Sequence, residues 1–459
     1  MSYEPTEIKQ LANRFPSNFT FGSATASWQI EGSSSTRGSS VWDDFAAVPG
    51  NIKDGTVADP ACDSVNRYQE DIQLLKFLGV DSYRFSVSWP RVYDFENKKP
   101  NQAGLDYYSK LIDGLLEAGI KPTLTMYHWD LPSELQQKGG WQWSGISDEF
   151  EKYAELLATN YVDRVDTWAT LNEPWVVSFL GHATSIHAPG LADPRAGFRS
   201  AYEQMIAHGK ALRVLRQHNA NKAGTVLNLT EIISDFDECQ DAVKHVDNLQ
   251  NGIWLDMLSG RGISDFTKES TAQFTDWSFV SEEDLKLVSQ PLDFLGINYY
   301  TPNRIEPADE QQSEVLGQGT EVYPGTGNVK FVSREPKSLM GWEVRPESLL
   351  NTIRATAKAL PNTPLMITEN GGAFPDQIDG DEVHDPERTS YYFQHLSACA
   401  DAIDEGIDLQ GYFCWSLMDN IEWAEGLEKR FGLFYVNHQT QKRTAKDSAK
   451  FISELLANR

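Results

Sequence analysis

Two stretches decide the fold of this 459-residue chain: Trp168-Ala-Thr-Leu-Asn-Glu173-Pro174 and Leu365-Met-Ile-Thr-Glu369-Asn-Gly-Gly372. Each is a short, largely apolar run that closes on a glutamate. An apolar run of this length is typical of a strand buried on both faces, as the strands of a parallel sheet are. A carboxylate is costly to bury, so stability alone gives it little reason to end such a strand. Both stretches therefore predict buried parallel strands with a functional group at the carboxyl end.

Similar runs recur along the chain, with helical patterns between them. In order, the eight expected strands are Phe19–Ala24, Ser82–Val87, Lys121–Tyr127, Thr167–Leu171, Ala223–Leu229, Phe294–Asn298, Pro364–Thr368 and Gly411–Trp415. The expected helices include Val65–Leu78, Tyr107–Ala118, Phe150–Tyr161, Phe198–His218 and Asp385–Glu405. This alternation predicts an α/β fold with a closed parallel sheet, a single (β/α)8 TIM barrel in which residues 1–459 form one domain.

The longest irregular stretch is Thr301–Gly341, which contains Gly, Pro, Gln and Glu and little periodicity. We expect it to be a loop after the sixth strand. A loop this long in a compact domain is usually functional or mobile. Long βα loops of this kind are expected to form the rim of the active site, because barrel active sites lie at the carboxyl ends of the strands.

The charge of the chain is strongly acidic, with 66 acidic and 40 basic residues and a net charge of -26. Nucleic acids and anionic membranes bind basic patches, so neither is expected as a partner. An acidic surface that aids solubility explains the composition, and tolerance of high salt is the sharper alternative. The oligomeric state is left open.

Cysteines and histidines give little support for a metal or a cofactor, and none is expected. The four cysteines form no C-x-x-C pair. His182 and His187 lie close together, but no Cys or Asp cluster accompanies them, so structural roles are favoured. The segment from Met1 to Phe19 does not have the pattern of a secretory signal, and no run reaches the length of a membrane span. A cytoplasmic enzyme is therefore the expectation.

Glu173 and Glu369 end the fourth and seventh expected strands, so both carboxylates should face one end of the barrel. Cleavage of a glycosidic bond needs two such groups, one to protonate the leaving oxygen and one to attack the anomeric carbon or activate water. The spacing does not say which residue takes which role. For either residue alone, a structural glutamate paired with an arginine is the alternative.

Seven short motifs follow one another in order along the chain. They are Phe21-Gly-Ser-Ala-Thr-Ala-Ser-Trp-Gln-Ile-Glu-Gly32, Tyr83-Arg-Phe-Ser-Val-Ser-Trp-Pro90, Tyr127-His-Trp-Asp-Leu-Pro132, Thr170-Leu-Asn-Glu-Pro174, Gly296-Ile-Asn-Tyr-Tyr300, Ile367-Thr-Glu-Asn-Gly371 and Trp415-Ser-Leu-Met-Asp-Asn-Ile-Glu-Trp423. Together they resemble glycoside hydrolase family 1, the β-glucosidase family, from Phe21 to Val436. The resemblance implies a retaining β-glucosidase that acts on terminal non-reducing β-D-glucosyl residues of β-glycosides or cello-oligosaccharides, with β-galactosidase or β-fucosidase side activity and a place in cellulose degradation.

The resemblance also assigns roles to residues. Glu369 is the nucleophile and Glu173 the acid/base. Arg84, Asn298 and Tyr300 support them, with Arg84 keeping Glu369 ionised; a purely structural salt bridge is compatible with that role. The sugar-binding residues implied are Gln29, His128, Trp129, Asn172, Trp342, Trp415, Glu422, Trp423 and Phe431.

Several of these assignments have a plainer alternative. Trp415 and Trp423 could simply pack in the core, as large aromatics often do. Glu422 favours the sugar site, since a carboxylate among apolar residues needs a partner. Members of the family that cleave 6-phospho-sugars carry Ser where this chain has Glu422 and Tyr where it has Phe431, so an unphosphorylated sugar is expected.

Three other functions stay open at this point. The covalent intermediate of a retaining enzyme could be intercepted by a sugar or alcohol, which would make the protein a transglycosylase. A sugar-binding protein without turnover would not need both glutamates. A metal-dependent barrel enzyme would lose activity in EDTA.

Overall fold

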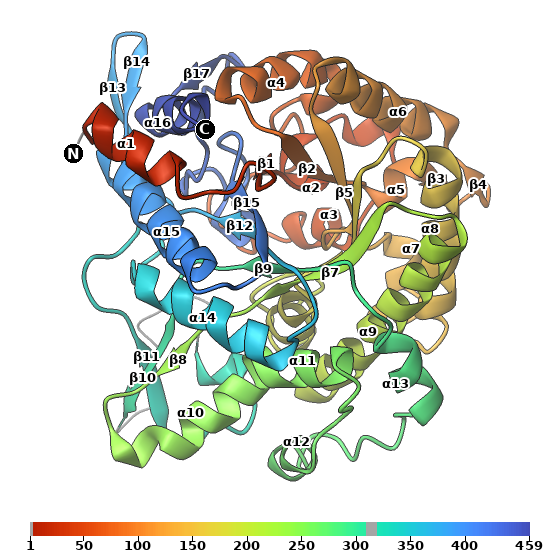
Figure 1. Cartoon of the computed structure of the whole chain (residues 1–459). Coiled ribbons are helices and arrows are strands. Elements are labelled where there is room, and N and C mark those ends of the chain that lie inside the picture. The colour runs from red at the N-terminus through yellow and green to blue at the C-terminus, as the bar shows by residue number, and fades with distance from the viewer. Residues whose placement is uncertain (1–2, 309–318) are drawn as a thin grey trace.

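The computed structural model describes residues 3–308 and 319–459, and eight parallel strands form a closed barrel at its centre (Figure 1). All eight expected strands are present, two of them with the expected ends and the others with ends shifted by one or two residues. They are β1 (Thr20–Ala24), β2 (Ser82–Ser86), β5 (Lys121–Tyr127), β6 (Thr167–Asn172), β7 (Lys222–Asn228), β9 (Phe294–Asn298), β12 (Leu365–Asn370) and β15 (Leu409–Trp415). β1 pairs with β15 and with β2, which closes the barrel.

A ring of helices covers the outside of the barrel (Figure 1). The longer ones are α4 (Ser64–Leu78), α6 (Gln102–Glu117), α8 (Ile146–Tyr161), α9 (Pro194–Gln217), α14 (Pro346–Ala359), α15 (Pro386–Asp404) and α16 (Asp447–Ala457). Shorter helices lie before β1 or in the segments that connect the strands; they are α1 (Pro5–Ala12), α2 (Ser27–Ile30), α3 (Val41–Ala46), α5 (Trp89–Val92), α7 (Ser133–Gln136), α10 (Gln240–Asp247), α11 (Ile253–Leu258), α12 (Asp265–Ser270) and α13 (Glu282–Val288). Every helix predicted from the sequence is present. Helix α1 packs against α16 and α15, so the first and last helices lie side by side.

Helix ends follow from local sequence. Pro386 opens α15 at a position where a backbone N–H would have no partner, and Gly79 closes α4 in the left-handed conformation (φ 76°) that glycine adopts without penalty. The strands are buried on both faces because helices cover the outside and side chains fill the barrel interior; β2 and β6 are buried along their whole length.

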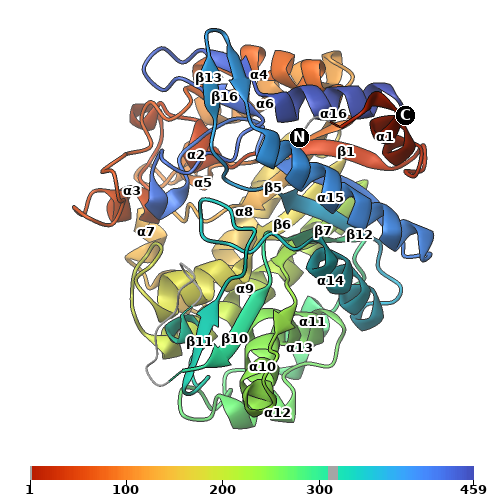
Figure 2. The same ribbon diagram turned by 90° about the vertical axis from the view of Figure 1, so that its left-hand side faces the viewer.

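The expectation that Thr301–Gly341 is irregular is wrong in part. β10 (Asn303–Pro307) and β11 (Val329–Val332) pair antiparallel, and β8 (Ile232–Ile233) adds to β10 to form a small sheet outside the barrel (Figure 2). Each strand is too short for its alternation to stand out in the sequence, but Ile305 and Phe331 are fully buried in this sheet. The rest of the expected loop includes residues 309–318, which lie outside the described residues.

Three two-stranded sheets are separate from the barrel. They are β3 (Tyr93–Asp94) with β4 (Lys99–Pro100), β13 (Gln377–Asp379) with β14 (Glu382–His384), and β16 (Phe434–Val436) with β17 (Arg443–Ala445). The loops 371–376 after β12 and 416–432 after β15 lie at the carboxyl end of the barrel. Within residues 3–308 and 319–459, no helix has the length and apolar character needed to cross a membrane.

Candidate active site

A cavity at the carboxyl ends of the strands encloses about 1110 Å³ of space, part of it open to solvent. Eleven of the fourteen residues proposed from the sequence line it: His128, Trp129, Glu173, Asn298, Tyr300, Trp342, Glu369, Trp415, Glu422, Trp423 and Phe431. The other three, Gln29, Arg84 and Asn172, are buried. Arg84 bonds to Glu369 and Asn172 to His128, whereas Gln29 bonds to the carbonyl of Ile421, next to Glu422. The structure therefore brings all fourteen together at one end of the barrel.

Glu173 follows directly after β6, with a left-handed backbone (φ 48°). Its N–H donates to the carbonyl of Val226 on the neighbouring β7. The side-chain amide of Asn298, at the end of β9, donates to Oε1 of Glu173 at 2.5 Å. No cation among the described residues forms an ion pair with Glu173; its polar support is a neutral amide.

Glu369, on β12, has a different environment. Nη1 of Arg84 donates to its Oε1 at 2.6 Å, and the hydroxyl of Tyr300 donates to its Oε2 at 2.6 Å. Both members of the Arg84–Glu369 pair are almost completely buried, with side chains 1% and 3% exposed. Each oxygen of Glu369 thus has one strong donor, and one of the donors is a cation.

Asn172, beside Glu173 at the end of β6, ties these elements together. Its Oδ1 accepts from Nη2 of Arg84 at 2.6 Å and from the amide of Asn298 at 3.0 Å. Its amide nitrogen lies 3.0 Å from Nε2 of His128. Asn298 in turn accepts from the hydroxyl of Thr368 at 2.7 Å, next to Glu369. One continuous network of hydrogen bonds therefore holds both glutamates.

The two glutamates differ in their proton affinity. Burial, followed by the negative charge of Glu369, raises the pKa of Glu173 to about 8. Burial also raises the pKa of Glu369, but Arg84 and then the hydroxyl of Tyr300 counteract that effect. Glu173 is therefore the group that holds a proton at neutral pH, and Glu369 the one whose ionised form has partners.

Burial, with Arg84 nearby, holds the pKa of His128 well below its usual range, so its ring is neutral. With Nε2 facing the amide of Asn172, a neutral ring carries its proton on Nδ1, which is buried and has no protein partner. That N–H is free to donate to a ligand hydroxyl.

Aromatic rings form one wall of the cavity. The rings of Trp423 and Trp129 lie 4.4 Å apart, and the ring of His128 stacks at 5.8 Å from Trp415 and at 5.7 Å from Trp423. Trp342 and Phe431, which also line the cavity, both pack against Tyr300. The exposure of these rings to the cavity favours ligand contact over plain core packing.

Glu422, next to Trp423 in the sequence, also lines the cavity. Burial, followed by the charges of Glu425 and the two central glutamates, raises its pKa well above the usual range. Gln29 lies behind it, with its amide nitrogen donating to the carbonyl of Ile421 at 2.6 Å and its buried Oε1 left without a protein partner. Both residues thus keep polar capacity for a ligand.

Other residues that line the cavity were not predicted from the sequence. It is lined by Trp175, Val176, Leu180, Ile186, Asn228, Leu229, Thr230, Gln250, Asn303, Tyr323 and Met340, among others. The hydroxyl of Tyr323 bonds with Gln250 at 2.5 Å and with Asn303 at 2.7 Å. Asn228 ends β7 and Asn303 begins β10, whereas most of the others lie in loops or in short helical segments that no periodic pattern marks. Indole groups next to a strand end, as in Trp175, were the one available signal.

His182 and His187, the two histidines considered as metal ligands, have different surroundings. His182 is buried and bonds through Nδ1 to the carbonyl of Val177 at 2.7 Å. His187 lines the cavity and packs against Trp42 and Trp129. Burial lowers the pKa of His182 to about 4 and that of His187 to about 3. Residues 3–308 and 319–459 contain no group of three or more His, Cys, Asp or Glu side chains placed to hold a metal ion.

The chain is similar to proteins of one family over almost its whole length. Residues 11–459 match the family model described as glycosyl hydrolase family 1. Beta-glucosidase A of Thermotoga maritima is 40% identical over 453 residues, which cover 97% of this chain and 98% of the relative. The bifunctional beta-D-glucosidase/beta-D-fucosidase of Bifidobacterium breve is 41% identical over 459 residues, with 97% and 98% of the two chains covered.

Solved structures give the same result for the fold. The psychrophilic beta-glucosidase of Micrococcus antarcticus superposes with a TM-score of 0.93 at 40% identity, covering 98% of this chain and 99% of that one. The Thermotoga maritima beta-glucosidase in complex with deoxynojirimycin superposes with a TM-score of 0.89 at 39% identity, covering 97% and 98%.

Proposed function

This chain belongs to glycosyl hydrolase family 1, and we propose that it is a retaining β-glucosidase that removes terminal non-reducing β-D-glucosyl residues. The observation that carries the proposal is the unequal environment of two carboxyl groups in one cavity. Glu369 has a cation and a hydroxyl as partners, whereas Glu173 has only the neutral amide of Asn298. A double displacement needs this pairing of an ionised nucleophile with a protonated acid.

In the first step, an oxygen of Glu369 attacks the anomeric carbon while Glu173 gives its proton to the glycosidic oxygen. The bond to the aglycone breaks, the aglycone leaves as an alcohol, and the sugar stays bound as an ester of Glu369. The charge of Glu369 is lost in this ester, and that charge is one reason for the raised pKa of Glu173. Glu173 therefore becomes more acidic when its role changes from acid to base.

In the second step, Glu173 takes a proton from water, and the resulting hydroxide attacks the anomeric carbon from the side the aglycone left. The ester bond breaks, Glu369 regains its charge and the sugar leaves with its β configuration. Asn298 keeps its contact with Glu173 through both steps, since its amide donates to the neutral and to the ionised carboxyl alike. Tyr300 orients Glu369 for attack.

The wall built from Trp415, Glu422 and Trp423 supports a neutral hexose as the bound sugar. An indole face provides a platform for the apolar side of a sugar ring, and Glu422 together with Gln29 can bond to its hydroxyls. A phosphate at C6 would find no cationic partner, because no Lys or Arg is among the described residues that line the cavity. The Bifidobacterium breve relative is named for both glucosidase and fucosidase activity, and we propose side activity on β-fucosides and β-galactosides here.

We also propose that residues 1–459 work as one catalytic domain. The support is the pairing of the first barrel strand with the last: β1 pairs with β15 from Thr20 to Ala24, so the barrel closes only when both ends of the sequence are in place.

The test is a panel of nitrophenyl β-glycosides with a common leaving group. We expect kcat/KM to be highest for the β-glucoside or β-fucoside, lower for the β-galactoside and lowest for the β-mannoside. NMR of early products should give the β-anomer of the free sugar. An α-anomer would contradict the retaining mechanism, and absence of turnover on every β-glycoside would contradict the enzyme assignment. Products formed at high alcohol concentration would measure the share of transglycosylation.

A further inference from the structure

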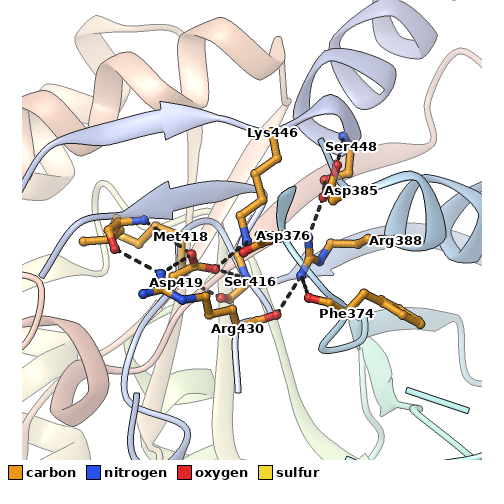
Figure 3. Close-up of polar contacts among 12 residues, drawn as sticks. Phe374, Asp376, Asp385, Arg388, Ser416, Met418, Asp419, Arg430, Lys446 and Ser448 are labelled. Carbon is orange, nitrogen blue, oxygen red and sulfur yellow. Dashed lines mark hydrogen bonds and ion pairs between the residues drawn. The ribbon is translucent and has the colours of Figure 1, made fainter. Parts of the chain in front are cut away.

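Six charged side chains meet beneath the two loops that follow β12 and β15 (Figure 3). They are Asp376, Asp385, Arg388, Asp419, Arg430 and Lys446. Five of the six side chains are at most 5% exposed, and only Arg430, at 25%, reaches solvent. Three carboxylates and three cations make the group neutral as a whole. We call it the buried ion cluster.

Lys446 joins the two loops directly. Its Nζ lies 2.7 Å from Oδ2 of Asp376, in the loop 371–376, and 2.7 Å from Oδ1 of Asp419, in the loop 416–432. The residue directly follows β17, near the end of the chain, and its side chain is completely buried. One cation thus spans the two loops.

Arg388, in the first turn of α15, bonds to backbone as well as to carboxylates. Its guanidinium donates to the carbonyls of Gly372 and Phe374 at 3.2 Å each, and to the carbonyl of Arg430 at 2.7 Å. It also pairs with Asp376 at 2.9 Å. These bonds fix the course of both loops, since Gly372 and Phe374 belong to the first and Arg430 to the second.

Asp419 organises the second loop from within. Its carboxylate accepts from the N–H groups of Gly432 at 3.0 Å and Val436 at 3.3 Å, in addition to Lys446 and Arg430. A Cβ at Gly432 would stand 2.0 Å from the backbone nitrogen of Asp419, so the chain can pass here only as glycine. Burial opposes the ionisation of Asp419, but Lys446, Arg430 and Arg388 together hold its pKa below the usual range.

The two loops carry the sugar-facing side of the cavity. The first begins two residues after Glu369. The second begins directly after Trp415 and contains Glu422, Trp423 and Phe431, all of which line the cavity. Asn420, next to Asp419, accepts from the amide of Gln29 at 3.1 Å. Asp419 and Arg430 of the buried ion cluster therefore lie within a few residues along the chain of the cavity-lining residues Trp415, Glu422, Trp423 and Phe431.

We propose that Lys446, Arg388 and Asp419 are positioning residues that set the distance between Glu369 and the sugar-binding wall of Trp415, Glu422 and Trp423. None of the three lines the cavity, so they act through the loops and not on the sugar. A displacement of either loop would leave buried charges of the cluster without their partners, which is costly in a dry interior, so the paired cluster favours one position of the two loops. A shift of about 1 Å in the wall would lower the rate, because a misplacement of that size can cost about 100-fold.

The inference rests on the proposed function, because its test measures the hydrolysis of a β-glucoside. The double variant Lys446→Met/Asp376→Asn removes the bridge between the loops and keeps the cluster neutral. Arg388→Lys keeps the charge but gives up the bonds to the loop carbonyls. The matched control is Arg443→Met/Asp71→Asn. It removes a buried ion pair between β17, the strand that directly precedes Lys446, and α4. Arg443 contacts Asp71, Gln441 and the carbonyl of Cys62, none of which lies in either loop. The thiol of Cys62 bonds to the carbonyl of Asp419, but neither substitution changes these two groups.

For Lys446→Met/Asp376→Asn and for Arg388→Lys, measured well below their unfolding temperatures, we expect kcat/KM on a nitrophenyl β-glucoside to fall by about 10- to 100-fold. The ratio of kcat/KM between β-glucoside and β-galactoside should fall as well, and the Kd for deoxynojirimycin should rise about tenfold, since the wall that reads the sugar has moved. The control variant should keep the native ratio and the native Kd.

A native ratio and a native Kd in both cluster variants would overturn the proposal. Equal losses in the control would also overturn it, because they would reduce the cluster to a general contribution to folding. Arg388→Lys decides the matter if the double variant does not fold. A wild-type protein without activity on any β-glycoside would instead count against the proposed function.

Discussion

Arg84 and Glu369 form a buried ion pair across the barrel, 285 positions apart in the sequence, with Nη1 and Oε1 separated by 2.6 Å. The pair has functional weight because Glu173, in the same cavity, has no cation of its own within the described residues. A cation that serves one of two neighbouring carboxylates separates their proton affinities and so separates their roles.

Replacing Arg84 with Met should therefore change the pH profile as well as the rate. Loss of the cation raises the pKa of Glu369, so a smaller fraction of Glu369 is ionised at a given pH. We expect the acidic limb of the kcat/KM profile to move to higher pH, with a fall at the optimum of about 10²- to 10³-fold. The measurement is kcat/KM from pH 4 to 9. An unmoved acidic limb would assign Arg84 a structural role only.

Replacing Glu369 with Gly should abolish turnover, because no other group in the cavity is placed to form the glycosyl ester. We expect kcat to fall by about 10⁴-fold or more, as when a nucleophile is removed. Added azide or formate fits the space of the lost carboxylate and should restore part of the rate, with azide giving an α-glycosyl product. Native activity in this variant would show that the nucleophile is another residue.

The effect of Glu173→Ala should depend on the leaving group. Alkyl glycosides need protonation of the departing oxygen and should lose about 10²- to 10⁴-fold in kcat/KM, the usual contribution of a general acid. The dinitrophenolate of a dinitrophenyl glycoside leaves without protonation, so these substrates should lose little in kcat/KM. The measurement is a series of leaving groups of different pKa. Equal losses along the series would count against the acid role.

The raised pKa of Glu173 also has a cost in stability, whose sign can be worked out. The folded state holds the proton up to a pH of about 8, whereas the ordinary value for a glutamate is 4.5. Between these limits the folded state binds more protons than the unfolded one, so stability falls as the pH rises through this window. At pH 7 to 8, Glu173→Gln should therefore increase the free energy of unfolding, by on the order of 2 kcal/mol.

The matched control for this prediction is Glu343→Gln. Glu343 is also buried, but Arg304 bonds to both of its oxygens, at 2.8 and 2.9 Å, and lowers its pKa against the effect of burial. Loss of its charge should destabilise the fold at pH 7. Thermal unfolding of both variants at pH 5 and 8 measures the two effects. A destabilised Glu173→Gln variant at pH 8 would contradict the raised pKa.

The barrel could be predicted from the sequence because its strands are buried on both faces and therefore read as apolar runs. Glu173 and Glu369 stood out for the same reason, as carboxylates that end such runs. Gln29 and Trp415 had no such signal, and only the resemblance of whole motifs to a family indicated them.

Other features depend on contacts that no local pattern records. Asn303 reaches the cavity from β10 of the small sheet beside the barrel, and Tyr323 from the turn before β11. Neither segment is long enough to predict from its pattern. Arg388 reads as an ordinary charged residue of a helix, yet it is completely buried, because its partners come from loops up to 42 positions away. Sequence periodicity predicts which face of an element is buried, but not which charges meet there.

The left-handed backbone of Glu173, with φ at 48°, has a consequence for protein engineering. A conformation that costs a residue with a Cβ about 1–3 kcal/mol is imposed here on the side chain that also resists ionisation. Glycine at this position would relieve the backbone and remove the carboxyl group together. Selection for thermal stability alone would thus enrich inactive variants with a substitution at position 173. A library screened for thermal stability therefore needs a parallel screen for turnover.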